Sequence, residues 1–224
     1  MTWDIHRIAR CGGLNELNRK QRRYVRESLQ MMYQNGGTVR EHRCSTNAPL
    51  LSLMDFVHRD GRIIACDGTV DNSPHSWCQI DNTTFEITFP LVIATEASAR
   101  QLTLDSLTQS HEVKFRYAWT EENFGKVLEE LFHMTHPSNG NLSPEDAAIL
   151  LKLVAPKLGV SLQKKGIARF TECTRKVRLE SDRIFNEGRR TNETVPEFQE
   201  RWRKEVDHLQ STVVRAWWRE YLDG

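Results

Sequence analysis

Three residues of this chain have types and spacing that suit catalysis together: Cys44, His75 and Glu86. The thiolate is the nucleophilic form of cysteine, and a histidine beside it lowers the thiol pKa and carries the proton. A carboxylate on the other ring nitrogen would hold the imidazole in the required tautomer. Such a set is typical of acyl transfer through a cysteine nucleophile, so the next question is which elements would position it.

Cys44 precedes a stretch that is typical of a helix. Residues 45–47 read Ser-Thr-Asn and are N-capping types, and Pro49 is tolerated in a first turn. We expect a helix over about 48–58, with Cys44 at its start. The helix dipole and the free N–H groups there favour a thiolate, and the same N–H groups would serve as part of an oxyanion hole. The alternative is a small buried hydrophobe, which is what most free cysteines are.

His75 and Glu86 fall in residues 62–90, which contain three short apolar runs separated by turn-forming pairs. The runs and the pairs are 63–65, 77–80, 85–89, Asp67-Gly68 and Asp81-Asn82. This pattern predicts antiparallel strands joined by tight turns, with His75 at the start of the middle strand and Glu86 inside the last one. Glu86 could then face His75 from a neighbouring strand. Asp81 is the other candidate acid, although a turn explains it more simply, and His75 could instead be a structural histidine.

The remaining elements fit an α+β fold. Apolar spacing predicts a helix over 14–34, a short helix near 95–108, a half-buried strand over 112–119, and helices from residue 120 onward, including 164–187 and 197–222. Ser143 would cap a helix whose Ile149, Leu150, Leu153 and Val154 face a core. We therefore expect N-terminal helices and a small antiparallel sheet in a catalytic domain over 1–119. An α-helical region over 120–224 would follow.

The order of these motifs resembles the transglutaminase-like branch of the papain-fold cysteine enzymes. The residues that carry the resemblance are Cys44 before a helix, His75-Ser76-Trp77 and Glu86-Ile87-Thr88, within about residues 36–90. The resemblance implies a papain/transglutaminase-like fold in which Cys44 is the nucleophile, His75 the base and Glu86 the orienting acid. It also implies an amide hydrolase or acyltransferase acting on a peptide or a glutamine side chain, without a metal or an organic cofactor. Two departures are the Glu in place of the usual Asp, and the lack of an aromatic residue or Gly before Cys44.

Composition narrows the other possibilities. The 31 basic and 30 acidic side chains leave no net field toward nucleic acid or membrane. The five cysteines have no metal-type spacing, so we expect reduced thiols. The first thirteen residues lack the apolar region of a signal peptide, and no apolar run has the length of a membrane span. We expect a cytoplasmic protein, or one in a host cytosol if it is an effector or viral protein.

Two non-catalytic interpretations remain open. In the first, the chain is a binding or assembly protein whose C-terminal helices, rich in Trp and Phe, contact a protein partner. In the second, the basic residues of 19–26 and of 164–178 bind RNA or DNA, although the neutral net charge favours a solvated helix face. Glu129 and His133 lie four residues apart on a predicted helix, but without an HExxH pattern they are a weak metal site.

Overall fold

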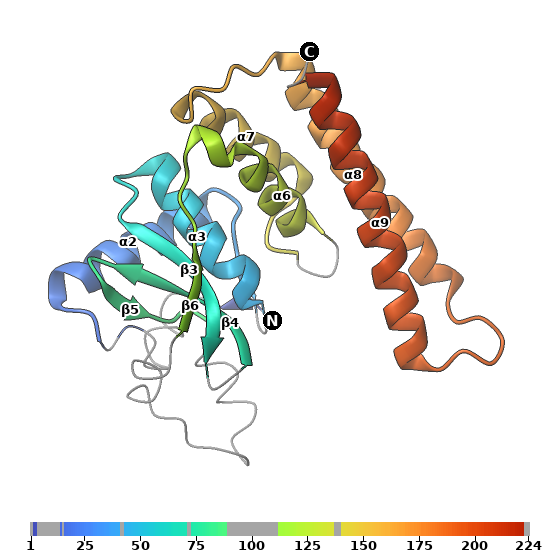
Figure 1. Ribbon diagram of the computed structural model, residues 1–224, viewed down its shortest axis with the longest axis horizontal. Coiled ribbons are helices and arrows are strands. Elements are labelled where there is room, and N and C mark those ends of the chain that lie inside the picture. The colour runs from blue at the N-terminus through green and yellow to red at the C-terminus, as the bar shows by residue number, and fades with distance from the viewer. Residues whose placement is uncertain are drawn as a thin grey trace. The chain divides into compact units, whose positions relative to one another are not determined.

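The computed structural model of the chain describes residues 2–3, 14, 16–40, 43–70, 73–88, 112–136 and 140–221. The chain divides into two compact units, Met1–Asn123 and Phe124–Gly224. The first unit combines helices with a small antiparallel sheet, and the second is helical (Figure 1). The predicted α+β class with a helical C-terminal region is therefore confirmed.

The main sheet of the N-terminal unit has four antiparallel strands in the spatial order β5-β4-β3-β6. Their bounds are β3 Ile63–Val70, β4 Ser73–Ile80, β5 Thr83–Phe85 and β6 Glu112–Arg116. Asp81 and Asn82 connect β4 to β5 with φ angles of 48° and 64°. A two-residue hairpin turn of this kind requires positive φ at both positions, and Asn and Asp tolerate it better than other residues with a side chain. The predicted turn at Asp81-Asn82 is confirmed.

The other predicted turn, at Asp67-Gly68, is wrong, because both residues lie inside β3. Pairing of β3 with β4 is continuous from Ile63 to Val70, whereas the register of β3 against β6 shifts between Asp67 and Gly68. A Cβ atom on Gly68 would lie 1.9 Å from the carbonyl oxygen of Glu112. Here glycine permits the close approach of a neighbouring strand at a bulge, which is its second common use besides turns.

Two helices accompany the sheet, α2 Arg19–Gln34 and α3 Cys44–His58. Asn18 caps α2 by accepting from the backbone N–H of Gln21 at 3.0 Å, so the helix begins later than the predicted Leu14. A second, two-stranded sheet pairs β1 Thr2–Trp3 with β2 Val39–Arg40 in antiparallel fashion. Strand β1 lies near the N-terminus, and β2 lies between α2 and α3 in the sequence.

Buried polar contacts fix α3 between α2 and the sheet. The Asp55 carboxylate accepts from the Ser28 hydroxyl of α2 at 2.7 Å and from the Ile63 backbone N–H at 2.9 Å. The Ser52 hydroxyl donates to the Ile63 carbonyl oxygen at 2.7 Å. The apolar side chains of α3 fill the core around these contacts, and Leu50, Leu51 and Leu53 are fully buried. Helix α3 is therefore held rigidly against β3, which matters for any group placed at its start.

Strand β6 differs from the predicted half-buried strand over 112–119. All of its side chains are exposed, with Phe115 exposed to 43%, and the strand ends at Arg116. Burial resumes at Tyr117, which leaves the strand. The alternation of apolar residues is present, but β6 is an edge strand, and edge strands can be exposed on both faces. The helix predicted near 95–108 lies outside the described residues.

The C-terminal unit consists of four helices in the described residues. They are α6 Phe124–Thr135, which follows the short 3₁₀ helix η1 Glu121–Asn123, and α7 Pro144–Lys157, α8 Lys164–Glu187 and α9 Val195–Tyr221. The predicted Ser143 cap is confirmed, since its hydroxyl accepts from the Asp146 N–H at 3.0 Å. Ile149 and Leu153 do not face the core as predicted: they are 56% and 40% exposed, and Leu151 lies inside instead. Apolar residues occur on more than one side of α7, so their spacing does not determine which side is buried.

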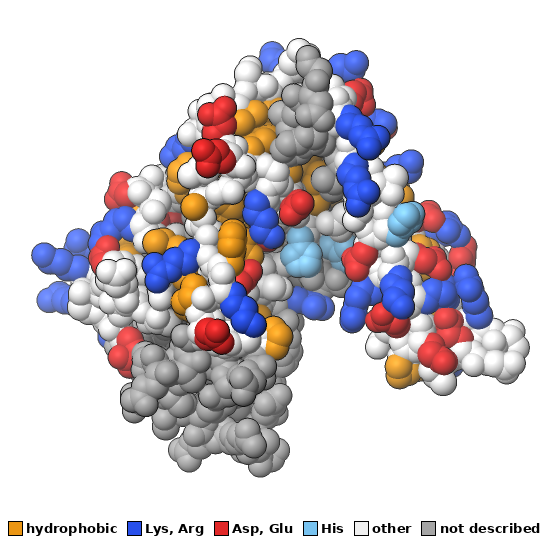
Figure 2. All heavy atoms as spheres, in the orientation of Figure 1, with side chains coloured by type: hydrophobic (Ala, Val, Ile, Leu, Met, Phe, Trp, Pro, Cys, Tyr) orange, Lys and Arg blue, Asp and Glu red, His pale blue; other side chains and the backbone are white. Residues whose placement is uncertain are grey.

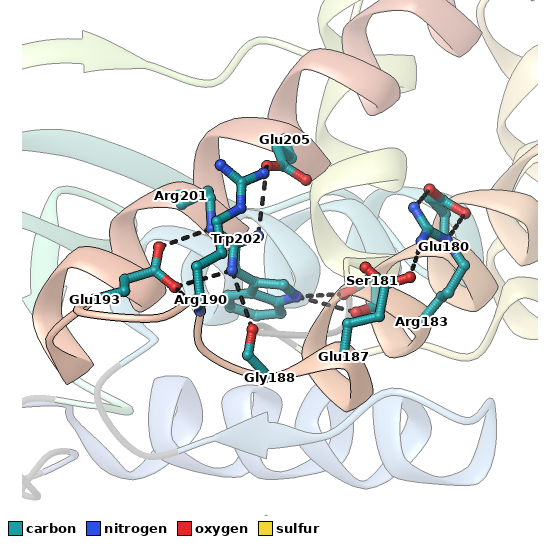
Figure 3. A network of polar contacts seen from close by, with 10 residues as sticks. All are labelled: Glu180, Ser181, Arg183, Glu187, Gly188, Arg190, Glu193, Arg201, Trp202 and Glu205. Carbon is teal, nitrogen blue, oxygen red and sulfur yellow. Dashed lines mark hydrogen bonds and ion pairs between the residues drawn. The ribbon is translucent and has the colours of Figure 1, made fainter.

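Helices α8 and α9 form a hairpin whose connection is tied by side chains (Figure 3). The Arg201 guanidinium bonds to both carboxylate oxygens of Glu193, at 2.7 and 3.0 Å, and donates to the Gly188 carbonyl at 3.1 Å. The Trp202 indole N–H donates to the Ser181 hydroxyl at 3.0 Å. No helix in the described part of the chain has both the length and the apolar character needed to cross a membrane.

Candidate active site

Cys44 is the first residue of α3, so the thiol lies at the helix start as expected. The capping prediction for residues 45–47 is wrong, because the helix already includes them and the N-cap is Arg43. The carbonyl of Arg43 accepts from the backbone N–H groups of Thr46 at 3.1 Å and Asn47 at 2.8 Å. A Ser-Thr-Asn run has the side chains of a cap, but here a backbone carbonyl begins the helix and frees the Asn47 side chain for a different contact.

His75 and Glu86 form a buried pair beside the thiol. His75 Nε2 lies 2.8 Å from Glu86 Oε1, and the two side chains are 9% and 2% exposed. His75 is in β4, as predicted. Glu86, however, directly follows β5 rather than lying inside it, because the pairing that starts after the Asp81-Asn82 turn ends at Phe85. The predicted contact between the acid and the histidine is present although the strand assignment of the acid is corrected.

The Cys44 thiol lies close enough to the His75 imidazole for each group to shift the pKa of the other. The Ser76 backbone also lowers the pKa of Cys44. The structure therefore brings all three predicted residues, Cys44, His75 and Glu86, into one connected set.

This geometry shifts both pKa values in opposite directions. Burial favours the neutral thiol, but the hydrogen bond and charge of His75, with the Ser76 backbone, outweigh it and lower the pKa of Cys44. Burial also disfavours the imidazolium, but the Glu86 carboxylate and the Cys44 sulfur outweigh it and raise the pKa of His75 to about 10. A lowered thiol pKa beside a raised imidazole pKa places a shared proton on the imidazole and increases the thiolate fraction of Cys44.

Cys44 is the only cysteine of the described residues whose pKa is lowered. Burial raises the pKa of Cys66 to about 11, and it also raises those of Cys78 and Cys173. All four are free thiols. The fifth, Cys11, lies outside the described residues. At Cys66 and Cys173 burial outweighs the nearby cations Arg116 and Arg169, and the raised pKa values make all three thiols poor nucleophiles. The contrast with Cys44 comes from His75.

The alternative acid, Asp81, is held elsewhere. Its carboxylate forms an ion pair with Arg62 at the exposed hairpin turn. Asp67, in contrast, lies close to the site: it accepts from the Ser76 hydroxyl at 2.5 Å and from the Tyr117 hydroxyl at 2.6 Å. Asp67 thereby anchors the residue whose backbone contacts the Cys44 sulfur, and it is a functional candidate that the sequence interpretation assigns to a turn.

Two further residues, Asn47 and Thr88, lie near the site and were not predicted to contact each other. Asn47 is fully buried, and its side-chain N–H donates to the Thr88 hydroxyl at 2.6 Å. Asn47 lies in the same helical turn as Cys44, and Thr88 is two residues beyond Glu86. A sequence signal exists for Thr88, which belongs to the Glu86-Ile87-Thr88 motif. For Asn47 the signal points to a helix cap and conceals this contact.

The remaining candidate sites gain little support. The described residues contain no cluster of three or more His, Cys, Asp or Glu that could hold a metal ion. On helix α2 the exposed Arg23 is paired with Glu27 at 3.8 Å, and Arg59 takes the same glutamate at 2.9 Å. Basic and acidic side chains are interspersed over the C-terminal helices on the face shown in Figure 2. This mixture is typical of a solvated surface rather than a nucleic-acid footprint.

Comparisons with protein-family models, with curated proteins and with solved structures find no match. The role of the Cys44, His75 and Glu86 set therefore has to be argued from its geometry.

Proposed function

We propose that the protein is a cysteine-dependent amide hydrolase or acyltransferase. Cys44 is the nucleophile, His75 the acid–base group and Glu86 the acid that orients His75. The observation that carries the proposal is the buried His75–Glu86 pair, 2.8 Å apart, beside the half-buried Cys44 thiol at the start of α3. Nucleophile, base and orienting group connected in this order are what covalent acyl transfer requires.

In the proposed reaction, the Cys44 thiolate adds to the amide carbonyl carbon, and the electron pair of the C=O bond moves to oxygen. The oxyanion is stabilised by the N–H groups of Cys44 and Ser45, since the first residues of a helix have no intrahelical acceptor. His75 then gives its proton to the amide nitrogen, the C–N bond breaks and the amine leaves. The product of this half-reaction is a thioester on Cys44.

The second half-reaction regenerates the enzyme. Water, or an amine in the transferase case, loses a proton to His75 and adds to the thioester carbonyl. The C–S bond breaks, and the sulfur leaves as the thiolate that pairs with the imidazolium. Glu86 retains its charge throughout and keeps the ring oriented, as the acid of a triad does. Cys44, His75 and Glu86 together with the backbone N–H groups at the start of α3 thus carry out both half-reactions.

The transglutaminase-like relationship remains part of the proposal. It is supported by the position of the nucleophile at the first residue of a helix, by the histidine in a strand and by the acid on the segment that follows the next strand. It implies that the acyl donor is a peptide or a glutamine side chain. The substitution of Glu for the usual Asp lengthens the orienting side chain by one methylene, and the 2.8 Å contact with His75 is compatible with that length.

The test is turnover of an amide substrate that depends on Cys44. The protein is incubated with a library of glutamine-containing and N-acyl peptide amides together with a biotinylated primary amine, and products are analysed by mass spectrometry. We expect amine incorporation or amide hydrolysis that Cys44→Ala and His75→Ala abolish. Cys173→Ala, a matched thiol deletion in the other unit, should retain activity. A product that forms equally with Cys44→Ala would overturn the proposal.

A second candidate function is protein binding by the C-terminal unit. It is supported by apolar side chains that this unit exposes, notably Leu179 at 70% and Phe185 at 59% on helix α8. Exposed apolar residues of this size on a helix are common in binding surfaces. Leu179→Glu would weaken capture of a partner that the unaltered protein retains, without a change in Cys44 chemistry. Equal capture by both would exclude α8 as the binding surface.

A further inference from the structure

The side chain of Asn47 joins three parts of the N-terminal unit. Its Oδ1 accepts from the Arg40 N–H at 3.0 Å, and its Nδ2 donates to the Arg40 carbonyl at 2.7 Å. Nδ2 also donates to the Thr88 hydroxyl at 2.6 Å. Asn47 is 0% and Thr88 1% exposed, so solvent cannot replace these bonds. The amide thus connects strand β2, the first turn of α3 and the segment that carries Glu86.

From these contacts we propose that Asn47, through Thr88, is a positioning residue that holds the Cys44 thiol in register with the His75–Glu86 pair. This inference rests on the proposed function, because it assigns Asn47 a role in the same site. Asn47 itself does not touch the reacting atoms. Its role is to fix the distance between the start of α3 and the segment after β5.

The reason a clamp is needed is that the three groups of the site come from separate elements. Cys44 begins a helix, His75 belongs to β4, and Glu86 lies just beyond the end of β5, where ladder hydrogen bonds no longer fix the backbone. The Asn47–Thr88 bond closes a ring of contacts that runs from Cys44 to His75, Glu86, Thr88 and Asn47. A closed ring limits the movement of each member, and a misplacement of about 1 Å in such a set costs on the order of 100-fold in rate.

Both partners of the bond are held by other contacts, which makes the clamp stiff. Asn47 is fixed by the two bonds to the Arg40 backbone, a pairing that mimics a strand partner. Thr88 follows Ile87, whose side chain is 2% exposed and packs in the core. A bond between two immobilised groups transmits position, whereas a bond to a mobile side chain would add only local stability.

The experiment removes the hydrogen-bond acceptor at position 88 and keeps the shape of the side chain. Thr88→Val removes the hydroxyl that accepts from Asn47 and keeps the β-branched volume, and Thr88→Ser restores an acceptor in the same place. Ser181→Ala is the matched control, because it removes the hydrogen bond of another buried hydroxyl, the 3.0 Å contact from the Trp202 indole N–H, in the helical unit. The readout is the pH dependence of Cys44 alkylation on the full-length protein, followed by peptide mapping.

We expect Thr88→Val to slow alkylation of Cys44 at neutral pH by about tenfold and to shift its profile to higher pH, because a displaced thiol loses its contact with the imidazolium. Thr88→Ser and Ser181→Ala should keep the wild-type profile. If Thr88→Val does not fold, Thr88→Ala, which leaves room for a water at Nδ2, is compared with Thr88→Ser instead.

Two negative results are distinguishable. If wild-type Cys44 labels fast and Thr88→Val changes only the melting temperature, the positioning role is overturned and the proposed function stands. If wild-type Cys44 labels no faster than Cys173, the proposed function fails, and this inference fails with it.

Discussion

The Cys44 and His75 side chains lie largely out of solvent, where an isolated charge is costly, yet their pKa values move in the direction that creates charges. The cause is mutual: each charge stabilises the other, and Glu86 adds a second negative group on the far side of the ring. Removing one member should therefore change the ionisation of the others. At this scale the account predicts pH effects rather than simple losses of contact.

The first prediction concerns Glu86→Gln, which removes the charge and keeps the size. His75 has a folded-state pKa of about 10, above its unfolded value of about 6.5, so its stabilisation is complete below about pH 6.5 and is lost as the pH rises through about 10. Without the carboxylate the folded-state pKa falls, and this pH dependence flattens. We expect wild type to lose about 2 kcal/mol more than Glu86→Gln in free energy of unfolding between pH 7 and 10.

Urea unfolding at a series of pH values measures this difference. Asp81→Asn is the control, because it removes an acid at the exposed turn, where Asp81 pairs with Arg62 rather than with His75. Parallel pH profiles for wild type and Glu86→Gln would contradict a raised His75 pKa caused by Glu86.

Residue types alone were enough to nominate the site. Cys, His and Glu are the residue types of a catalytic triad. The hairpin pattern in the sequence predicts that His75 and Glu86 come from neighbouring strands and lie close together. Asn47 and Asp67 could not be assigned in this way. A polar residue at a helix start is commonly a cap, and an Asp before a glycine is commonly part of a turn. The contacts observed instead are distant in sequence: Asn47 bonds to Thr88, 41 residues away, and Asp67 bonds to Tyr117, 50 residues away.

At the scale of elements, the site depends on the way β3 supports β4. His75 is paired with Gly68, and the same glycine receives the close approach of Glu112 from β6. A side chain at position 68 would meet the Glu112 carbonyl at 1.9 Å and the Trp77 ring at 2.8 Å. The bulge thus makes β6, an exposed edge strand, part of the support for the strand that carries the histidine.

The second prediction is that Gly68→Ala displaces β6 and destabilises the N-terminal unit by about 1–3 kcal/mol, the usual cost of overpacking. Gly166→Ala is the matched control: it lies in the first turn of α8, and an added Cβ would meet only ordinary contacts with Tyr221 at 3.4 Å and beyond. We expect Gly166→Ala to be neutral or stabilising by up to about 1 kcal/mol. Urea unfolding of both variants decides, and equal stabilities would contradict the packing around Gly68.

The predicted elements succeed where periodicity and local turn chemistry agree. The α8 helix over Lys164–Glu187 and the Asp81-Asn82 turn are both confirmed. The errors occur where one sequence pattern fits two structures. Asp67-Gly68 predicts a turn but lies at a bulge in β3. The apolar alternation of β6 predicts a half-buried strand, but β6 is an exposed edge strand. Burial depends on which neighbours the fold supplies, and a single sequence does not specify them.

At the scale of the whole molecule, the chain consists of two compact units, and every residue of the candidate site lies in the first. The contacts of Cys44, His75, Glu86, Asn47 and Thr88 with one another are all made within Met1–Asn123. We therefore expect the proposed chemistry to be retained without the helical unit, whose own core is formed by α6 to α9.

The third prediction is that a fragment of residues 1–123 folds and retains the rapid alkylation of Cys44. Each unit has its own hydrophobic core, as an independently folding domain needs. Circular dichroism and site-resolved labelling of the fragment, compared with the full chain, measure this. A folded fragment in which Cys44 loses its reactivity would show that the helical unit completes the site.

The thiolate–imidazolium pair is tested most directly by the pH dependence of iodoacetamide labelling of each cysteine in the folded protein. The account predicts that Cys44 labels much faster than Cys66, Cys78 and Cys173 at neutral pH, with an apparent pKa below the ~8.5 of a free thiol, and that His75→Ala removes the difference. If Cys44 labels as slowly as the other three, or if His75→Ala leaves its profile unchanged, the thiolate–imidazolium pair does not exist, and the proposed acyl-transfer chemistry is contradicted.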